Sequence, residues 1–386
     1  MAKEETLRAR AVSMHTQGQS VSDIAKILGR SRQWVHKWIN RSRSDSEAWS
    51  QSLSTAPHCS PNKVSLCMEE QVISARQQLL ASPYHEAGAY AIRHQLQGNG
   101  ITPPSVATIN RILKRNGLVT NKIHRSKSGL DYPEEPIDMH VMDLIGPRYL
   151  RGGGRYYLFT IISNDTRHAG VYPILSKSGQ NITQSVIRFW QSYSLPCFLK
   201  LDNELSFRGS NRHPRGLGLL LRTALSLNVV PIFIPVSEPW RNGVIERFNQ
   251  KVEDTFLTQE HNSFEELCSH AQEFVTVHNQ THHYSTMGHK TPAELDREHA
   301  YLIKPLSSDY QLYEKPPLDS GNLNEIRFIR LVRSDLTVNV LNTVIPVKKE
   351  LMYTYVEVVL LVNEHRLLLK QDNQVVQSVE FVMPLC

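Results

Sequence analysis

The sequence predicts an α/β chain in which helical units precede a mixed sheet and a small antiparallel β-barrel follows it. Three observations predict this. Up to residue 118 the apolar residues recur at spacings of three and four, as in helices. From 137 they gather into strand-length runs that alternate with helical patterns, and after 324 short strand-like runs follow one another. A chain of 386 residues is also too long for one ordinary core.

The first unit, residues 1–43, has the pattern of a helix-turn-helix. A helix over 4–17 ends at Gly18, and Ser20 and Ser31 are placed to cap two further helices separated by Gly29. The third helix turns Val35, Trp38 and Ile39 inward. A helix of this kind can enter the major groove of DNA, whereas a plain three-helix bundle is the alternative. The residues expected to face outward are Arg32, Gln33, Trp34, His36 and Lys37.

A second helical unit is expected over 67–118, with helices at 68–81, 84–97 and 104–116. Its last helix is basic, so we interpret the unit as a second DNA-binding domain, although generic helical hairpins share the pattern. Stretches 42–66 and 119–135 have the composition of linkers. The basic residues assigned to DNA contact in the last helix are Arg111, Lys114 and Arg115.

Charge is distributed unevenly along the chain. Residues 1–130 hold 18 Lys and Arg against 8 Asp and Glu, a balance of +10, whereas the remainder carries −4. Basic charge at one end indicates a polyanion partner there. Five cysteines lack paired spacing and are expected to be reduced. No run of about 18 apolar residues occurs, so we expect no membrane span.

The central part, 137–300, is expected to have the order βββαβαβα. Strand-like runs occupy 137–146, 155–165 and 169–175, and a helix over 180–193 follows. A strand at 197–203, a helix at 217–227, a strand at 229–235 and a helix containing Glu246 complete it. The strands expected over 324–386 form the small barrel.

Three acids occupy special places in this order. Asp143 lies within the first strand, Asp202 at the end of the fourth, and Glu246 on the polar side of a helix. An acid in an apolar strand costs several kcal/mol if it is left unpaired, so each needs a partner. Nearby Lys or Arg could supply it. Three carboxylates converging at one edge of the sheet would instead form an oxygen-only site suited to Mg²⁺ or Mn²⁺.

The side that Glu246 occupies follows from helical spacing. An apolar stripe on the same helix faces the core, which leaves Glu246 on the other side, with Asn242 four residues before it and Asn249 three after. The stripe consists of Val244, Ile245, Phe248, Val252 and Phe256.

The segments MDLIG, LDNE and PWRNGVIERFN, followed by HNQTHHYSTMGHKTPAEL, resemble the RNase H-like core of retroviral integrases and of insertion-sequence transposases with a DDE triad. The resemblance covers roughly 137–295. It implies that Asp143, Asp202 and Glu246 are the catalytic triad and hold two Mg²⁺ or Mn²⁺ ions. It also implies cleavage and strand transfer of double-stranded DNA at element ends and target, by a homo-oligomer with a possible helper protein, in the bacterial cytoplasm at the nucleoid.

The sequence departs from this family in three places. Between Asp202 and Glu246 lie 43 residues, more than is usual, and Glu204 stands where the family commonly has Gly. Glu253 occupies a position that is often basic, so Lys251 is expected to make the DNA contact of this helix. Arg241 is expected to contact DNA as well.

Two other functions fit the same residues. The chain could be a DNA-binding regulator that descends from a transposase and has a dead site, or a nuclease that only hydrolyses DNA. The presence of all three acids favours an active strand transferase. Metal-dependent joining of DNA ends separates the three, because a regulator joins nothing and a nuclease only cuts.

Overall fold

The computed structural model describes residues 2–43, 49–52, 64–119, 131–209, 215–318 and 324–384. The chain divides into two compact units, Met1–Val64 and Ser65–Cys386. Each has a hydrophobic core of its own. Within the described ranges, no helix combines the length and the apolar character needed to cross a membrane.

The first unit is the expected helix-turn-helix. Ser20 accepts a hydrogen bond from the amide of Asp23, Ser31 accepts one from that of Trp34, and Gly29 adopts a φ of 63° at the end of the second helix. These local signals confirm the sequence-based caps. The helices are α1 (Ala2–Thr16), α2 (Val21–Leu28) and α3 (Arg32–Ser42), and their core contains Ala11, Ile24, Val35 and Ile39.

Two expectations for this unit need correction. Trp34 does not face outward but is half-buried against the core, with its ring edge-on to Trp38 at a centroid distance of 6.3 Å. The large ring gains more from burial than from exposure. Arg8 stacks on Trp38 at 4.1 Å and donates to the carbonyl of Ser50 at 2.7 Å. Part of the expected linker 42–66 is therefore held to the helices.

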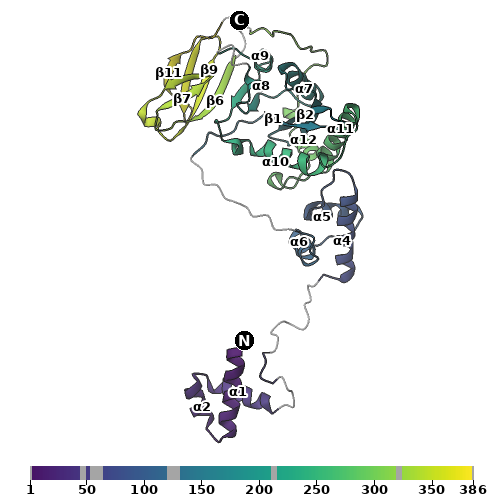
Figure 1. Cartoon of the computed structure of the whole chain (residues 1–386), viewed down its shortest axis with the longest axis vertical. Coiled ribbons are helices and arrows are strands. Elements are labelled where there is room, and N and C mark those ends of the chain that lie inside the picture. Colours follow the sequence, from purple (N-terminus) through teal and green to yellow (C-terminus); the bar gives the residue numbers. More distant parts are fainter. Residues whose placement is uncertain are drawn as a thin grey trace. The chain divides into compact units, whose positions relative to one another are not determined.

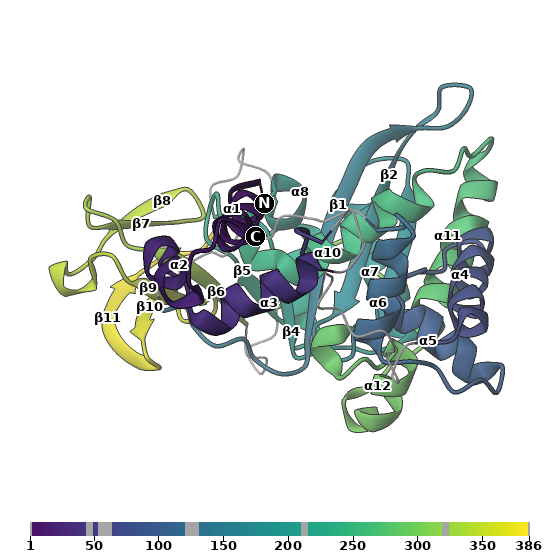
Figure 2. The ribbon, with the colours of Figure 1, turned by 90° about the horizontal axis from the view of Figure 1, so that it is seen from below.

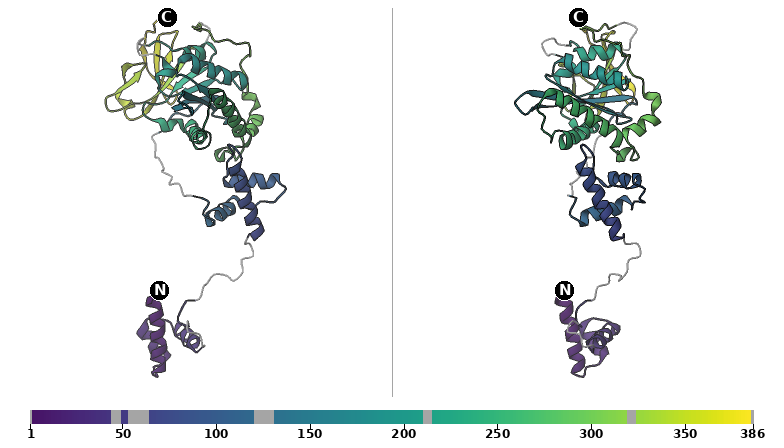
Figure 3. Two further views of the ribbon diagram at one scale, coloured as in Figure 1. Left: turned by 45° about the vertical axis from the view of Figure 1, so that its right-hand side comes forward. Right: turned by 90° about the vertical axis from the view of Figure 1, so that its right-hand side faces the viewer.

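The second unit begins with a three-helix group, shown in Figure 3. It comprises α4 (Leu66–Ala81), α5 (Ala89–Gly98) and α6 (Val106–Arg115). The helix expected from residue 84 begins only at 89. Tyr84 instead has a φ of 62° and is buried beside Phe256 and Phe274 of the following α/β part. Burial of this ring outside the helical group moves the start of α5.

The α/β part follows the predicted order. Strands β1 (Met139–Tyr149), β2 (Arg155–Ser163) and β3 (Ala169–Ile174) form an antiparallel meander, and β4 (Phe198–Leu201) and β5 (Val230–Phe233) add in parallel beside β1. A short helix, α8 (Leu205–Arg208), was not predicted. The other helices are α7 (Gly179–Ser192), α9 (Leu219–Ser226), α10 (Gly243–Lys251), α11 (Phe264–Thr281) and α12 (Pro292–Glu298).

Alternation along the strands gives the sheet two apolar faces. Met142 and Phe159 belong to the cluster that contains α7 and α9, whereas Val141 and Leu158 belong to the cluster that contains α10 and α11. Figure 1 shows α7 and α9 on one side of β1 and β2, with α10 on the other. The sheet is therefore covered on both faces, and α10 is held against it by its apolar stripe.

The C-terminal strands are consistent with a small β-barrel, and they also extend the central sheet. β6 pairs in parallel with β5, with Phe328 opposite Phe233, so that one sheet runs in the order β11-β10-β9-β6-β5-β4-β1-β2-β3. Figure 2 shows this continuation. The strands are β6 (Glu325–Leu331), β9 (Tyr355–Leu361), β10 (Arg366–Gln371) and β11 (Gln374–Glu380), with a separate hairpin of β7 (Thr337–Val340) and β8 (Thr343–Pro346).

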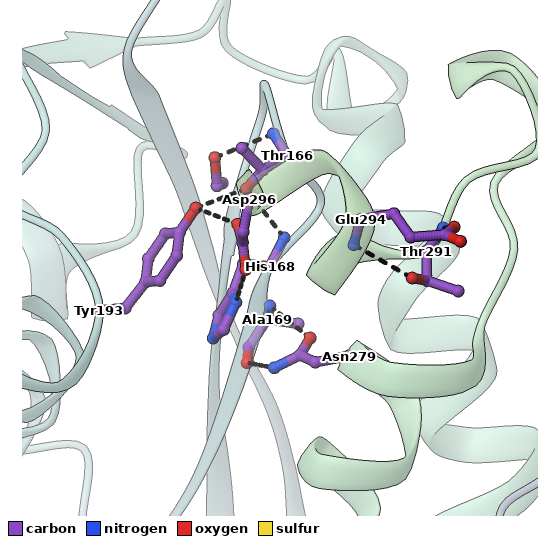
Figure 4. Close-up of polar contacts among 9 residues, drawn as sticks. Thr166, His168, Ala169, Tyr193, Asn279, Thr291, Glu294 and Asp296 are labelled. Atoms are coloured by element: carbon purple, nitrogen blue, oxygen red, sulfur yellow. Dashed lines mark hydrogen bonds and ion pairs between the residues drawn. The ribbon is translucent and has the colours of Figure 1, made fainter. Parts of the chain in front are cut away.

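Figure 4 shows how the segment after α11 is held to the sheet. Asp296 of α12 accepts a hydrogen bond from the Tyr193 hydroxyl at 2.7 Å and pairs with Nδ1 of His168 at 2.7 Å. Thr291 and Glu294 form a reciprocal capping box at the start of α12. The KTPAEL part of the family-like segment thus has a structural role.

Asn279, near the end of α11, makes a second attachment (Figure 4). Its side-chain oxygen accepts from the amide of Ala169 and its nitrogen donates to the carbonyl of the same residue, both at 3.0 Å. A buried carboxamide that pairs with both backbone groups of one residue replaces a neighbouring strand at the start of β3.

Candidate active site

Asp143 is half-buried in β1, and both of its carboxylate oxygens accept hydrogen bonds. Oδ1 accepts from the amide of Leu144 at 2.7 Å, and Oδ2 accepts from Nδ2 of Asn249 on α10 at 2.8 Å. The Thr160 hydroxyl on β2 donates to the Asn249 side-chain oxygen at 2.8 Å. The acid is therefore held by neutral donors rather than by Lys or Arg.

The surroundings of Asp143 disfavour its charge. Burial raises the pKa of Asp143 to about 6, and the negative charges of Asp202, Glu204 and Glu246 act in the same direction, against the hydrogen bond from Leu144. Asp143 therefore lies close enough to Asp202 and to Glu246 for the charge of each to act on it. These residues come from a strand, a loop after another strand and a helix.

Asp202 follows β4 directly and is half-buried. Its Oδ1 accepts a hydrogen bond from the amide of Glu204 at 2.9 Å. Burial raises the pKa of Asp202, the charge of Glu204 adds to the rise, and Lys177 opposes it. Glu204 itself pairs with Lys177 at 2.7 Å. Glu204 thus lies within electrostatic range of two triad members and is a competing acid.

Glu246 is exposed on α10, as helical spacing predicts. Ile245 and Phe248, on the other side, are buried at 0% and 2% exposure. Val252 and Phe256 are also buried and lie in a π-helical turn, η2 (Val252–Phe256), that continues the helix. The predicted apolar stripe is confirmed, with Val244 partly buried.

A pocket of about 480 Å³ separates α10 from the end of β1. Asp143, Glu246 and Asn249 line it together with Glu253, whose carboxylate pairs with Arg148 at 2.7 Å. Asp202 lies outside this lining. The pocket is open, and the carboxylates of Asp143, Glu246 and Glu253 line it.

The donor chemistry of the three acids suits a hard cation, since carboxylate oxygens are the ligands that Mg²⁺ and Mn²⁺ prefer. Among the residues that the structure describes, no group of three or more His, Cys, Asp or Glu side chains is gathered closely enough to hold a metal ion. The three acids therefore share an electrostatic environment without forming a complete coordination shell.

Of the residues assigned to DNA contact in the two helical groups, some are exposed and one has an ion-pair partner within the protein. Arg32, Gln33, His36 and Lys37 are all exposed on α3. On α6, Arg111 and Lys114 are exposed, whereas Arg115 forms an ion pair with Glu69 of α4.

Arg241 and Lys251, the basic residues assigned to DNA near the triad, both have partners inside the protein. Arg241 donates to the Tyr355 hydroxyl at 3.0 Å, pairs with Glu238 at 3.2 Å and stacks on Tyr132 at 4.0 Å. The side chain of Lys251 is 10% exposed and pairs with Glu86 at 2.9 Å. Contact of either residue with DNA stays a prediction. For that contact, Arg241 or Lys251 would have to leave its partners in the protein and bind DNA instead.

Sequence reasoning did not assign Glu86, Thr160 or the contact of Asn249 with Asp143. Burial raises the pKa of Glu86. A hydrogen bond with His282 and the charges of Lys251 and His282 outweigh this effect and lower the pKa to about 2. Asn249 could have been found, since it lies three residues after Glu246 and so on the same side of the helix. No sequence signal indicates Glu86, whose partners lie more than 160 residues away.

Two models of known protein families match segments of the chain. Residues 2–48 match the family model of the homeodomain-like domain, and residues 227–292 match that of the integrase core domain. The second match contains α10 and Glu246. It also contains the attachment made by Asn279.

Similar solved structures include the HTLV-2 integrase catalytic core domain in complex with magnesium, with 13% identity, a TM-score of 0.32, and coverage of 42% of this chain and 96% of that one. The catalytic core domain of BIV integrase has 14% identity and a TM-score of 0.33, covering 43% and 99%. The simian T-cell lymphotropic virus intasome in complex with the PP2A regulatory subunit B56 gamma has 12% identity and a TM-score of 0.37. The match covers 60% of this chain and 76% of that one.

These similarities are too low to carry weight, and the assignment rests on the two family matches and on the sheet order. A homeodomain-like helix-turn-helix precedes an integrase core in which a meander of three strands is followed by two parallel strands. The chain therefore contains one segment similar to the homeodomain-like domain and one similar to the integrase core domain.

Proposed function

We propose that this protein is a transposase that binds the ends of a mobile DNA element and performs metal-dependent cleavage and strand transfer. The observation that carries the proposal is that Asp143 of β1 and Glu246 of α10 line one open pocket, while Asp202 directly follows β4, the strand that pairs with β1. Acids that repel one another at one place are costly unless a cation neutralises them.

Two divalent cations would be held by Asp143, Asp202 and Glu246, where they would neutralise charge on the attacking and leaving oxygens of a phosphodiester. Asn249 holds Asp143 through Oδ2, and the amide of Leu144 holds Oδ1. The remaining lone pairs of both oxygens stay available. Glu246 is exposed and can approach from the helix.

Two displacements at phosphorus make up the reaction. In the first, the oxygen of water bonds to the phosphorus and the 3′ oxygen of the element's end leaves as a hydroxyl. In the second, that 3′ hydroxyl bonds to a phosphorus in the target strand, and the target's own 3′ oxygen leaves. In each step one phosphorus–oxygen bond forms as another breaks, and the proton lost by the attacking oxygen is matched by the one that the leaving 3′ oxygen gains.

DNA recognition is assigned to the basic outer faces of α3 and α6, through Arg32, Gln33, His36, Lys37 and the exposed residues of α6. Pairing two element ends requires more than one catalytic core, so we expect a homo-oligomer on DNA. We also include a possible helper protein, which would take part in the choice of target DNA.

The test is an end-joining assay on the full chain with Mn²⁺ or Mg²⁺ and duplexes taken from the DNA on either side of the coding region. A transposase produces nicked ends and joined products, and neither forms when EDTA is present. Cutting without joining would identify a nuclease. Binding without cutting or joining would identify the alternative function, a regulator with a dead site.

A further inference from the structure

We propose that Arg330, on the C-terminal strand β6, is a positioning residue for Asp202, acting through Asn203. This rests on the proposed function, because it assigns a role relative to a triad member. It makes the C-terminal strands part of the active-site framework rather than an appended module.

Arg330 joins three parts of the chain. Nη2 donates to the side-chain oxygen of Asn203 at 2.9 Å, Nη1 donates to the carbonyl of Ile234 at 2.9 Å, and Nε donates to the carbonyl of Asn339 at 2.9 Å. The residue is 7% exposed. The guanidinium therefore connects the loop after β4, the end of β5 and the β7 strand.

The acceptors around Arg330 are neutral, which is unusual for a buried cation. The oxygens that receive its hydrogen bonds belong to backbone carbonyls and one carboxamide. Burial lowers the pKa of Arg330 to about 10, and the charge of Arg208 acts in the same direction. A buried charge held in this way costs stability that an apolar side chain would not. The four hydrogen bonds of Arg330 fix the geometry of the groups that accept them.

Asp202 is held on both sides of its backbone by the same junction. The carbonyl of Leu201, before it, accepts from the amide of Ile234 at 3.0 Å. Asn203, after it, donates through Nδ2 to the carbonyl of Ile234 at 2.7 Å, and Arg330 fixes the other end of this carboxamide. Asp202 cannot shift along its loop without breaking one of these bonds.

The loop that follows Asp202 makes further contacts with the C-terminal strands. Arg208 donates to the Asn342 side chain at 3.1 Å, and Arg215 donates to the carbonyl of Val382 at 2.9 Å. Arg208 and Arg215 both lie between Asp202 and Glu246, where the spacing is longer than is usual in the family that the sequence resembles. The longer spacing thus coincides with anchoring to the C-terminal strands.

The test compares Arg330→Met, Arg330→Lys and Asn203→Ala in the full chain, with Arg327→Met as the matched control. Arg327 lies on the same strand but pairs with Glu325 and Glu357. Hydrogen exchange of the backbone around Asp202 is measured without metal or DNA, beside end cleavage and end binding. Asn203→Ala leaves β6 intact, so it separates loop positioning from general stability of the strands.

We expect faster exchange around Asp202 and cleavage lowered by about 10–100-fold in Arg330→Met and Asn203→Ala, with end binding unchanged. Arg330→Lys keeps the charge but lacks the forked N–H donors of the guanidinium, so its exchange and cleavage rates should lie between those of the wild type and of Arg330→Met. A double variant that carries Arg330→Met and Asn203→Ala should cleave DNA no more slowly than the slower single variant, since both changes break the same link between Arg330 and Asn203. Arg327→Met should match the wild type.

Normal exchange and normal cleavage in Asn203→Ala would overturn the inference, even if Arg330→Met failed to fold. Additive losses in the double variant would overturn it too, since they would indicate independent effects. If the wild type joined and cut no DNA, the proposed function would fall instead. The exchange comparison would still show whether Arg330 holds the loop.

Discussion

At the residue scale, the carboxylate of Asp143 accepts hydrogen bonds from the amide of Leu144 and from the side chain of Asn249. The sequence predicts that this acid needs a partner, and both of its partners are neutral. The Asn249 contact spans 106 residues of sequence. Such contacts depend on how helix and sheet dock, which single-residue patterns do not encode. The same holds for Glu204, whose charge adds to the rise in the pKa of Asp143.

The raised pKa of Asp143 predicts that Asp143→Asn removes a loss of stability that the metal-free wild type undergoes between pH 4 and neutral pH. Folding favours the protonated form, so the contribution of this residue to stability is greatest below about pH 4 and is lost as the pH rises through about 6. Asn has only one of the two acceptor oxygens of Asp143, so the effect of the charge is measured as a difference between two pH values. The free energy of unfolding of the variant relative to the wild type should rise by about 1–3 kcal/mol from pH 4 to pH 7.5. Urea unfolding at pH 7.5 and pH 4 measures this, and an equal gain at both would contradict the assigned cause.

At the scale of elements, the predicted helices and strands are largely confirmed because their apolar periodicity is long and their caps are local. The late start of α5 and the short α8 were missed, since Tyr84 is buried by distant residues and α8 has a single turn. The parallel pairing of β6 with β5 was missed as well. It joins segments nearly a hundred residues apart.

The apolar stripe of α10 predicts a large loss of stability for Phe248→Ala. Phe248 is 2% exposed, lies 6.2 Å from Phe274 between ring centroids and meets His278 edge-on at 4.9 Å. Loss of the ring and the cavity left behind should cost about 3–5 kcal/mol. Gln250→Ala, at an exposed position on the same helix, should change stability by less than about 0.5 kcal/mol. Equal unfolding midpoints for the two variants would exclude the assigned packing.

At the scale of the whole molecule, the uneven charge predicts that DNA binding depends on the first unit. Replacing Arg32 and Lys37 by Ala should weaken binding to end DNA and reduce the slope of log affinity against log salt by about one for each phosphate that is no longer neutralised. Arg10→Ala, which removes an exposed charge from α1, serves as the control. Fluorescence anisotropy over a salt series measures both. An unchanged slope in the double variant would assign end binding elsewhere.

The most direct test of the central claim is a strand-transfer assay with Mg²⁺ on Asp143→Asn, Asp202→Asn, Glu246→Gln, Glu204→Gln and Glu253→Gln. Glu253 is about two turns from Glu246, roughly 10 Å along the axis, so only one of the two can join a site with Asp143 and Asp202. The account predicts that the first three variants fold and bind end DNA but neither cleave nor join it, whereas Glu204→Gln and Glu253→Gln stay active. A Glu246→Gln protein that still joins DNA ends, or a folded Glu204→Gln protein that joins none, would contradict it.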